Sequence, residues 1–160
     1  MAYLPVSGAD FCQMMNLPAD MADNPLWALH SGLVMGLMAR YTLDEAMKDA
    51  STYTPEDPEE GEAQVIESEY YHALRLAYSY FMLSQTAHLL NLKTLGQGIV
   101  KSIGLDSSTT ALLSGHEMDQ LASTLELKGL SALGAYISQE GLQRMRELTP
   151  VPKRFRIGVI

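Results

Sequence analysis

Glu69 and His72 come closer than other residues to a spacing that could carry chemistry. On a helix, residues three apart share a face. A Glu-x-x-His pair is half of a carboxylate-bridged di-metal site, which needs a second such pair and two further carboxylates. The residues three before the other histidines are Trp27, Gln85 and Leu113, so the ligand set is incomplete. We therefore favour a surface pair over a metal site.

His116 and Glu117 begin like the zinc-protease motif His-Glu-x-x-His. The position of the second histidine is occupied by Gln120, so that ligand is missing. Ser114 and Glu117 instead have the spacing of a capping box, which satisfies backbone donors at the start of a helix. We assign Glu117 to the cap.

The remaining patterns for binding or catalysis are weaker. The Gly-Gln-Gly run at 96–98 follows an expected helix and lacks the third glycine of a dinucleotide loop, so we interpret it as a turn. Phosphate-loop and nucleophile-elbow patterns do not occur in the sequence. Cys12 is expected to be a small buried hydrophobe. Whether a Ser, a His and an Asp meet in the fold stays open. We predict no enzyme, no catalytic residues, no metal and no cofactor.

Two helices are expected before residue 41. Ser7 can cap the first, with Phe11, Met14 and Met15 on its apolar side, and Leu17-Pro18 ends it. Asn24-Pro25 is a strong start for the second, over 26–40. Its apolar positions at helical spacing are Leu26, Leu29, Leu33 and Leu37, flanked by Met38. Thr42 and Glu45 are spaced as a capping box for a further short helix through about Asp49.

An acidic, turn-rich linker covers 51–61. Within it, Asp57-Pro58 marks the expected start of a long helix that runs to about Lys93. One face carries Tyr70, Leu74, Ala77, Phe81, Ser84, His88 and Leu92. Further apolar residues widen this face, which predicts a helix central to the core.

The last third of the chain changes character. Residues 95–105 suggest a short strand or extended loop, and 106–110 a polar turn. The helix opened by Ser114 is expected to include Met118, Leu121, Leu125 and Ile137 among its apolar positions. A short helix over 139–148 follows. The pattern predicts a mostly α fold: a small helical bundle around a long central helix, one short extended segment, and an extended C-terminal arm. Residues 1–149 form the domain and 150–160 the arm.

The composition is that of one globular domain, with 160 residues, 47% hydrophobic and 19% charged. A single cysteine excludes an internal disulfide and favours a reducing compartment. We expect no signal peptide, because no basic segment precedes an apolar run at the N-terminus. We expect no membrane span, because the uncharged stretch 76–92 carries polar side chains that are costly in lipid. The ten methionines fit a helical core, or else an adaptable contact surface.

Charge is distributed unevenly along the chain. The net charge of -8 argues against general nucleic-acid binding. Residues 44–69 contain ten acids and one base, whereas 150–160 contain three bases and no acid. The arm therefore favours contact with another surface, the alternative being that it folds back on its own acidic body. The expected partner-binding residues are Pro150, Pro152, Lys153, Arg154, Phe155, Arg156, Ile157, Val159 and Ile160.

The order of these parts resembles the head–tail connector, or neck adaptor, proteins of tailed bacteriophages. The matching parts are 7–16, 25–40, 58–93, 98–105, 114–138 and 150–160. The likeness is one of layout, and the linker over 51–61 is longer than a minimal connection.

The resemblance implies a structural virion protein that forms a dodecameric ring beneath the portal and extends the DNA exit channel. Its partners would be the portal protein, the next neck or tail protein and other copies of itself. DNA would pass without sequence-specific binding, and an acidic wall would repel its phosphates. The resemblance implies no membrane, a location in the virion neck, and synthesis in the host cytoplasm.

Two other classes of function remain open. A helical regulatory module could hold a partner peptide in a methionine-rich groove. A small helical enzyme or metal carrier would depend on Glu69 and His72.

The lone Glu69–His72 pair predicts that the purified protein binds no stoichiometric metal. Elemental analysis measures this directly. One or two equivalents of iron, manganese or zinc, lost in His72→Ala, would contradict the prediction.

Overall fold

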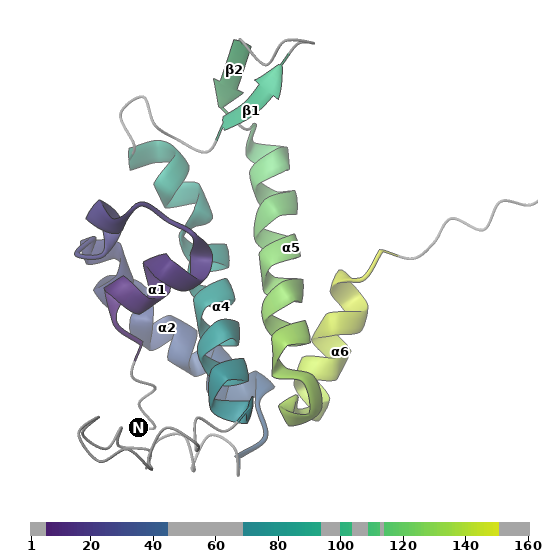
Figure 1. Ribbon diagram of the computed structural model, residues 1–160. Helices are drawn as coiled ribbons and strands as arrows, with labels where there is room; N and C mark the ends of the chain where they lie inside the picture. Colours follow the sequence, from purple (N-terminus) through teal and green to yellow (C-terminus); the bar gives the residue numbers. More distant parts are fainter. Residues whose placement is uncertain (1–5, 45–68, 94–99, 104–108, 113, 151–160) are drawn as a thin grey trace, which may run out of the picture.

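The computed structural model describes residues 6–44, 69–93, 100–103, 109–112 and 114–150 (Figure 1). The elements in chain order are α1 (Gly8–Met15), η1 (Ala19–Met21), α2 (Pro25–Tyr41), α4 (Glu69–Lys93), β1 (Val100–Ile103), β2 (Thr109–Leu112), α5 (Gly115–Leu133), η3 (Gly134–Tyr136) and α6 (Gln139–Leu148). The two η elements are single 3₁₀ turns. The expectation of a mostly α bundle around a long helix is confirmed.

Helix α4 is the centre of the bundle, and it contacts α1, α2 and α5. Leu74, Ala77 and Phe81 on its predicted face are completely buried, and Ser84 nearly so. His88 continues that face but is exposed. The predicted start at 57–58 lies outside the described residues, as do the side chains of Tyr70 and Leu92 on that face.

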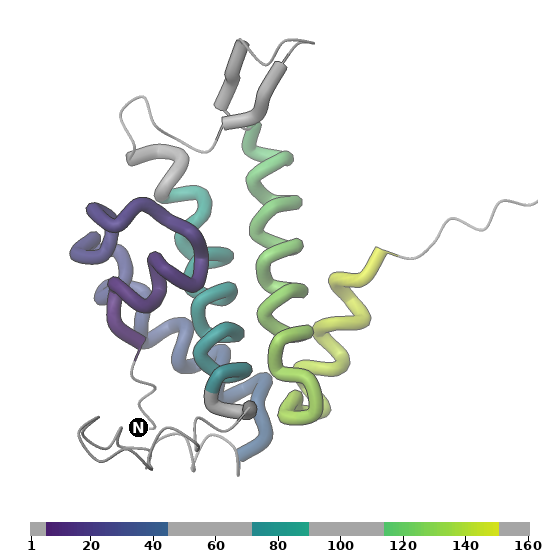
Figure 2. Tube along the Cα trace, in the orientation of Figure 1, coloured from purple at the N-terminus to yellow at the C-terminus, as the bar shows by residue number. Residues whose placement is uncertain are grey.

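The close approach of α4 and α5 depends on Gly129. A Cβ atom at this position would lie 2.7 Å from Cε1 of Phe81 and 2.9 Å from Cδ1. These distances are shorter than van der Waals contact, so the ring occupies the space that a side chain would take. Glycine therefore lets the two longest described helices pack closely (Figure 2).

Helix α1 begins and ends as its residue types predict. Ser7 and Asp10 form a capping box, and the Ser7 hydroxyl accepts from the Asp10 amide at 3.1 Å. The helix stops at Asn16, whose φ of 53° is left-handed. Phe11 and Cys12 are buried, so the expectation for Cys12 is confirmed.

The apolar face expected for α2 is confirmed at Leu26 and Met38 but wrong at Leu29 and Leu33. Leu29 is 76% exposed and Leu33 is 51% exposed, whereas Leu37 is half-buried. The residues that α2 buries are Leu26, Trp27, Val34, Met38 and Tyr41. Because the helix is apolar nearly all round, its spacing allowed more than one inward face, and contacts with α1 and α4 select one. The start at Asn24-Pro25 is confirmed, since Asn24 Oδ1 accepts from the Leu26 amide at 3.0 Å.

The expected extent of the helix after Ser114 is wrong at its C-terminal end. Helix α5 starts with the predicted Ser114–Glu117 capping box but ends at Leu133. Gly134 follows with φ 54° and ψ -120°, a conformation that ends the helix and that side chains with a Cβ rarely adopt. Ile137 lies beyond this turn and pairs with Thr42 in an isolated antiparallel bridge. The predicted helix over 139–148 is confirmed as α6.

The expected polar turn over 106–110 is wrong at its end, where Thr109 and Thr110 belong to strand β2. Strand β2 pairs antiparallel with β1, in register from Val100 opposite Leu112 to Ile103 opposite Thr109. The short strand expected within 95–105 is present as β1, whereas the second strand of the hairpin was not predicted, because short threonine-rich strands carry a weak signal.

Several expectations concern segments outside the described residues. These are the linker over 51–61, the glycine run at 96–98, and the arm after Pro150. The short helix expected through Asp49 is described only as far as Asp44. In the described part of the chain, no helix combines the length and hydropathy that crossing a membrane requires.

We expect Phe81→Ala to lower the free energy of unfolding by about 3–5 kcal/mol, since it removes a buried ring from the α4–α5 contact. Denaturant unfolding measures the change. The matched control Leu29→Ala removes an exposed side chain and should change stability by less than about 0.5 kcal/mol. Equal effects of the two substitutions would show that Phe81 is not a core anchor.

Candidate protein-binding groove

The residues that could bind a metal do not gather in the described structure. His72 is exposed, and the side chain of Glu69 does not belong to the described part of the structure. His30 Nδ1 lies 3.0 Å from the Leu26 carbonyl oxygen, and His116 Nε2 lies 3.0 Å from Gln120 Nε2. Among the residues described, no three of the His, Cys, Asp and Glu side chains group as metal ligands.

One histidine lies beside a carboxylate. His88 Nε2 on α4 is 3.0 Å from Asp119 Oδ1 on α5, and both side chains are largely exposed. Ser84 lies one turn before His88 on α4, and its hydroxyl donates to the Ala122 carbonyl at 2.8 Å instead of to the histidine. The contact therefore links two helices and is not part of a serine–histidine–aspartate relay in the described residues.

Cys12 is also unsuited to nucleophilic chemistry. Its side chain is buried, and this burial raises the pKa of the thiol above its usual range. A raised pKa lowers the fraction of reactive thiolate.

The arm begins on a firmly held helix. Arg144 of α6 donates to Glu126 of α5 from Nε at 2.7 Å and from Nη2 at 2.9 Å. This paired contact raises the pKa of the Arg144 guanidinium, which stays charged. Arg40 of α2 forms an ion pair with Glu140 at the other end of α6. Pro150 is exposed directly after α6, and the predicted arm residues beyond it lie outside the described part.

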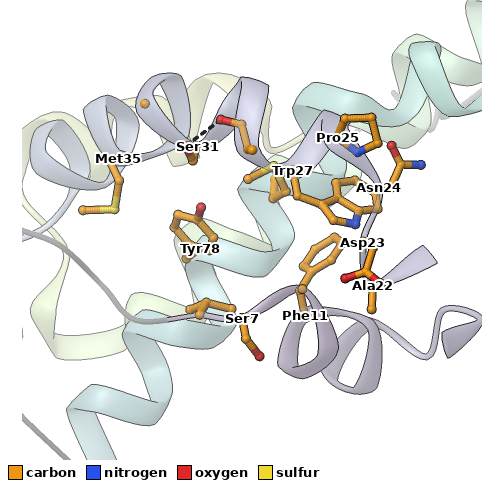
Figure 3. Close-up of a pocket in the computed structure, with 15 residues that line it drawn as sticks. Ser7, Phe11, Ala22, Asp23, Asn24, Pro25, Trp27, Ser31, Met35 and Tyr78 are labelled. Atoms are coloured by element: carbon orange, nitrogen blue, oxygen red, sulfur yellow. Dashed lines mark hydrogen bonds between the residues drawn. The ribbon is translucent and has the colours of Figure 1, made fainter. Parts of the chain in front are cut away.

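A groove of about 630 Å³ opens on the side of the molecule that carries α1 (Figure 3). It lies between the start of α1, the first half of α2, and α4. Its lining residues are Val6, Ser7, Gly8, Phe11, Ala22, Asp23, Asn24, Pro25, Trp27, Ala28, Ser31, Gly32, Met35, Tyr78 and Met82. The spacing of residues in the sequence does not indicate this groove, because its walls come from three separate helices.

Aromatic rings and sulfur-bearing side chains form the walls of the groove. The Phe11 and Trp27 rings are 4.6 Å apart between centroids, with their planes tilted by 60°. Tyr78 and Met35 lie across the groove from Phe11, on α4 and α2 respectively (Figure 3). Phe11, Trp27 and Tyr78 are buried, so the groove presents only their edges together with smaller apolar residues. A mostly apolar lining of this kind favours protein contacts.

Most polar atoms around the groove are already engaged. The Trp27 indole donates to the Met21 carbonyl at 2.6 Å, and the Ser31 hydroxyl donates to the Ala28 carbonyl at 2.8 Å. Ser7 Oγ lies 2.7 Å from Asp10 Oδ2 within the capping box. Asp23 provides an exposed carboxylate at the rim. The groove therefore supplies few groups to orient a small polar ligand, but it suits apolar side chains flanked by positive charge.

The apolar surface continues beyond the groove along α2. Ala28 and Gly32 line the groove, and the exposed Leu29 and Leu33 lie beside them on the same helix. Burying a leucine side chain is worth about 1.5–3 kcal/mol, so this ridge is a strong contact surface if a partner covers it. The methionines divide: Met38, Met82 and Met118 are buried, whereas Met35 is half-buried in the groove wall.

An ion pair holds α1 in place over the groove. Asp10 Oδ2 lies 3.0 Å from Arg75 Nη2 of α4. Hydrogen bonds from Ser7, and then the charge of Arg75, lower the pKa of the Asp10 carboxyl below its ordinary value of 3.8.

The lowered pKa of Asp10 predicts an acid-dependent contribution to stability. A carboxyl with a lowered pKa in the folded state stabilises the fold above pH 3.8, and this contribution is lost as the pH falls through the folded pKa. Asp10→Asn should therefore destabilise the protein at pH 7 and lessen the dependence of its melting temperature on pH between 5 and 2. Asp44→Asn, at an exposed site outside the capping box, is the control. Parallel pH profiles for the wild type and Asp10→Asn would refute this role.

Comparison of the chain with protein-family models, with curated proteins and with solved structures found no match. The groove, the exposed leucine ridge and the root of the arm are the features from which we infer a function.

Proposed function

We propose that the protein is a structural adaptor of a phage neck, which forms a ring beneath the portal and extends the DNA exit channel. The arm over 150–160 is proposed to attach it to the portal. This proposal extends the resemblance in layout to the head–tail connectors, and layout is an argument from analogy.

The observation that carries the proposal is the position of two unlike contact features. The groove lies on the side of α1, whereas α6, which ends at the root of the arm, lies on the other side of α4 and α5 (Figures 1 and 2). A subunit with different front and back contacts joins its neighbours head to tail. Such contacts close into a ring when the rotation between subunits allows it.

Charge and chemistry are consistent with a passive channel. The net charge of -8 gives the chain no general affinity for DNA phosphates. Several described titratable residues form ion pairs that connect helices, as Arg144 and Glu126 do. We propose on this basis that the role is structural and not enzymatic.

A second function is favoured by the groove itself. A helical binding module would use the groove walls at Phe11, Trp27 and Met35 to hold a peptide, and it would need no ring. The metal-carrier alternative has less support, because His72 is exposed and no ligand cluster accompanies it in the described residues. Formation of a ring on a portal would distinguish the adaptor from the binding module, which needs no ring.

We expect the isolated protein to be monomeric or weakly associated, and to form a ring when a candidate portal protein is added. Deleting residues 150–160 should leave the melting temperature nearly unchanged and abolish attachment to the portal. Native mass spectrometry of the mixture, together with thermal unfolding, measures both quantities.

The matched pair of charge variants is the triple reversal of Lys153, Arg154 and Arg156 to Glu, and Arg146→Glu on the exposed surface of α6. The triple variant should attach weakly, with less dependence on salt, whereas Arg146→Glu should attach normally. A stable two-fold dimer under every condition would count against the adaptor, and attachment without the arm would make the arm structural.

A further inference from the structure

The groove between α1, α2 and α4 is open in the described part of the chain, and Figure 3 shows the side chains that line it. Exposed apolar surfaces of this kind, extended here by Leu29 and Leu33, mark contact sites for proteins. We propose that the groove is the receptor for the arm, residues 150–160, of a second copy of this chain. This inference concerns the arm in the absence of a portal, where it binds a second copy. The portal of the proposed function would compete with that copy for the same arm.

Charge is the first argument for this occupant. Residues 1–39, which supply all of the groove except its α4 wall, contain three aspartates and no lysine or arginine. Two of these aspartates, Asp20 and Asp23, are exposed. The arm carries three positive charges and no acid. The two segments are therefore electrostatically complementary.

The pattern of the arm is the second argument. In an extended chain, alternate side chains point to opposite sides. Phe155, Ile157 and Val159 then share one edge with Lys153, while Arg154 and Arg156 share the other with Ile160, so one edge is mainly apolar. The apolar edge matches the apolar lining of the groove, and the arginines match Asp23, the acid among its lining residues. Pro150 and Pro152 limit the conformations of the arm, which reduces the entropy lost on docking.

Position is the third argument, and it favours docking between copies. Pro150 follows α6, which packs on α5 and the end of α2, whereas the groove is formed by the first half of α2. An extended arm of eleven residues reaches about 36 Å from this root, at about 3.3 Å per residue. The root and the groove lie on different sides of α4 and α5 (Figure 1), so a groove on a neighbouring copy is open to an arm of this length. Repetition of this contact is head to tail, as a ring or a chain requires.

A complementation experiment with the full-length chain tests the proposal. Ala28→Arg places a bulky positive charge at an exposed position in the groove wall and should block the groove. The triple reversal of Lys153, Arg154 and Arg156 to Glu should disable the arm. Wild-type protein should associate in a concentration-dependent way in sedimentation velocity, and each variant alone should sediment as a monomer.

The decisive sample is an equimolar mixture of the two variants. One partner retains an arm and the other a groove, so the mixture should form a dimer that cannot grow further. If the arm docks only on another protein, the mixture stays monomeric and the proposal fails. If the arm docks in its own groove, wild-type protein stays monomeric although the mixture can still pair, and the proposal also fails. The proposal is also overturned if wild-type protein stays monomeric at all concentrations and does not bind a labelled peptide of residues 150–160.

The controls separate groove contacts from general effects of charge and folding. Ala39→Arg makes the same change at an exposed position of α2 outside the groove lining, and it should associate like the wild type. Asp23→Lys should weaken association about tenfold, as expected for a contact of about 1.4 kcal/mol, whereas Asp44→Lys should not. Thermal unfolding verifies that each variant is folded. Equal losses for Ala28→Arg and Ala39→Arg would show that the groove is not the receptor.

Discussion

The contact between Phe81 and Gly129 is the constraint on which the rest of the structure depends. A ring in the space of a missing side chain brings α4 and α5 together over the centre of the molecule. Each of the other described helices then packs against this pair or against an element that touches it: α1 and α2 on α4, and α6 on α5 and α2. A change in the spacing of α4 and α5 would therefore displace both the groove and the root of the arm.

The groove exists because α2 is apolar on more than one side. Trp27, Val34 and Met38 satisfy the core, and the helix still presents Met35 on one flank and Leu29 outward. Helix α1 covers only part of this surface. Its position is fixed by the Phe11–Trp27 ring contact and by the ion pair between Asp10 and Arg75, so the uncovered part has a defined shape. Preformed apolar surfaces bind with a smaller loss of conformational entropy than surfaces that must be ordered.

The ion pairs of the described structure hold elements together instead of forming a reaction centre. Arg144 and Glu126 fasten α6 to α5, Arg40 and Glu140 fasten α2 to α6, and Asp10 and Arg75 fasten α1 to α4. Each pair connects two helices near the surface, where such pairs add orientation more than stability. They keep the α1 side and the α6 side of the bundle in a fixed relation, which suits a subunit with unlike contacts on its two sides.

The sequence alone determined the features that depend on neighbouring residues. Capping residues such as Ser7, Asn24 and Ser114 marked where helices begin, because they bond to backbone amides two or three positions away. The spacing of Leu74, Ala77 and Phe81 identified the buried face of α4 for the same reason. The charge pattern likewise predicts the arm as a separate segment, since charge is a property of composition.

Tertiary structure decided what depends on distant partners. The inward face of α2 was set by α1 and α4, so Leu29 and Leu33 became a surface ridge despite their helical spacing. Ile137, beyond the end of α5 at Gly134, pairs with Thr42, which lies about a hundred residues away in the chain. The groove itself required three helices to meet at fixed angles. Local spacing carries no information about such meetings, because they arise only when side chains far apart in sequence compete for the same interior space.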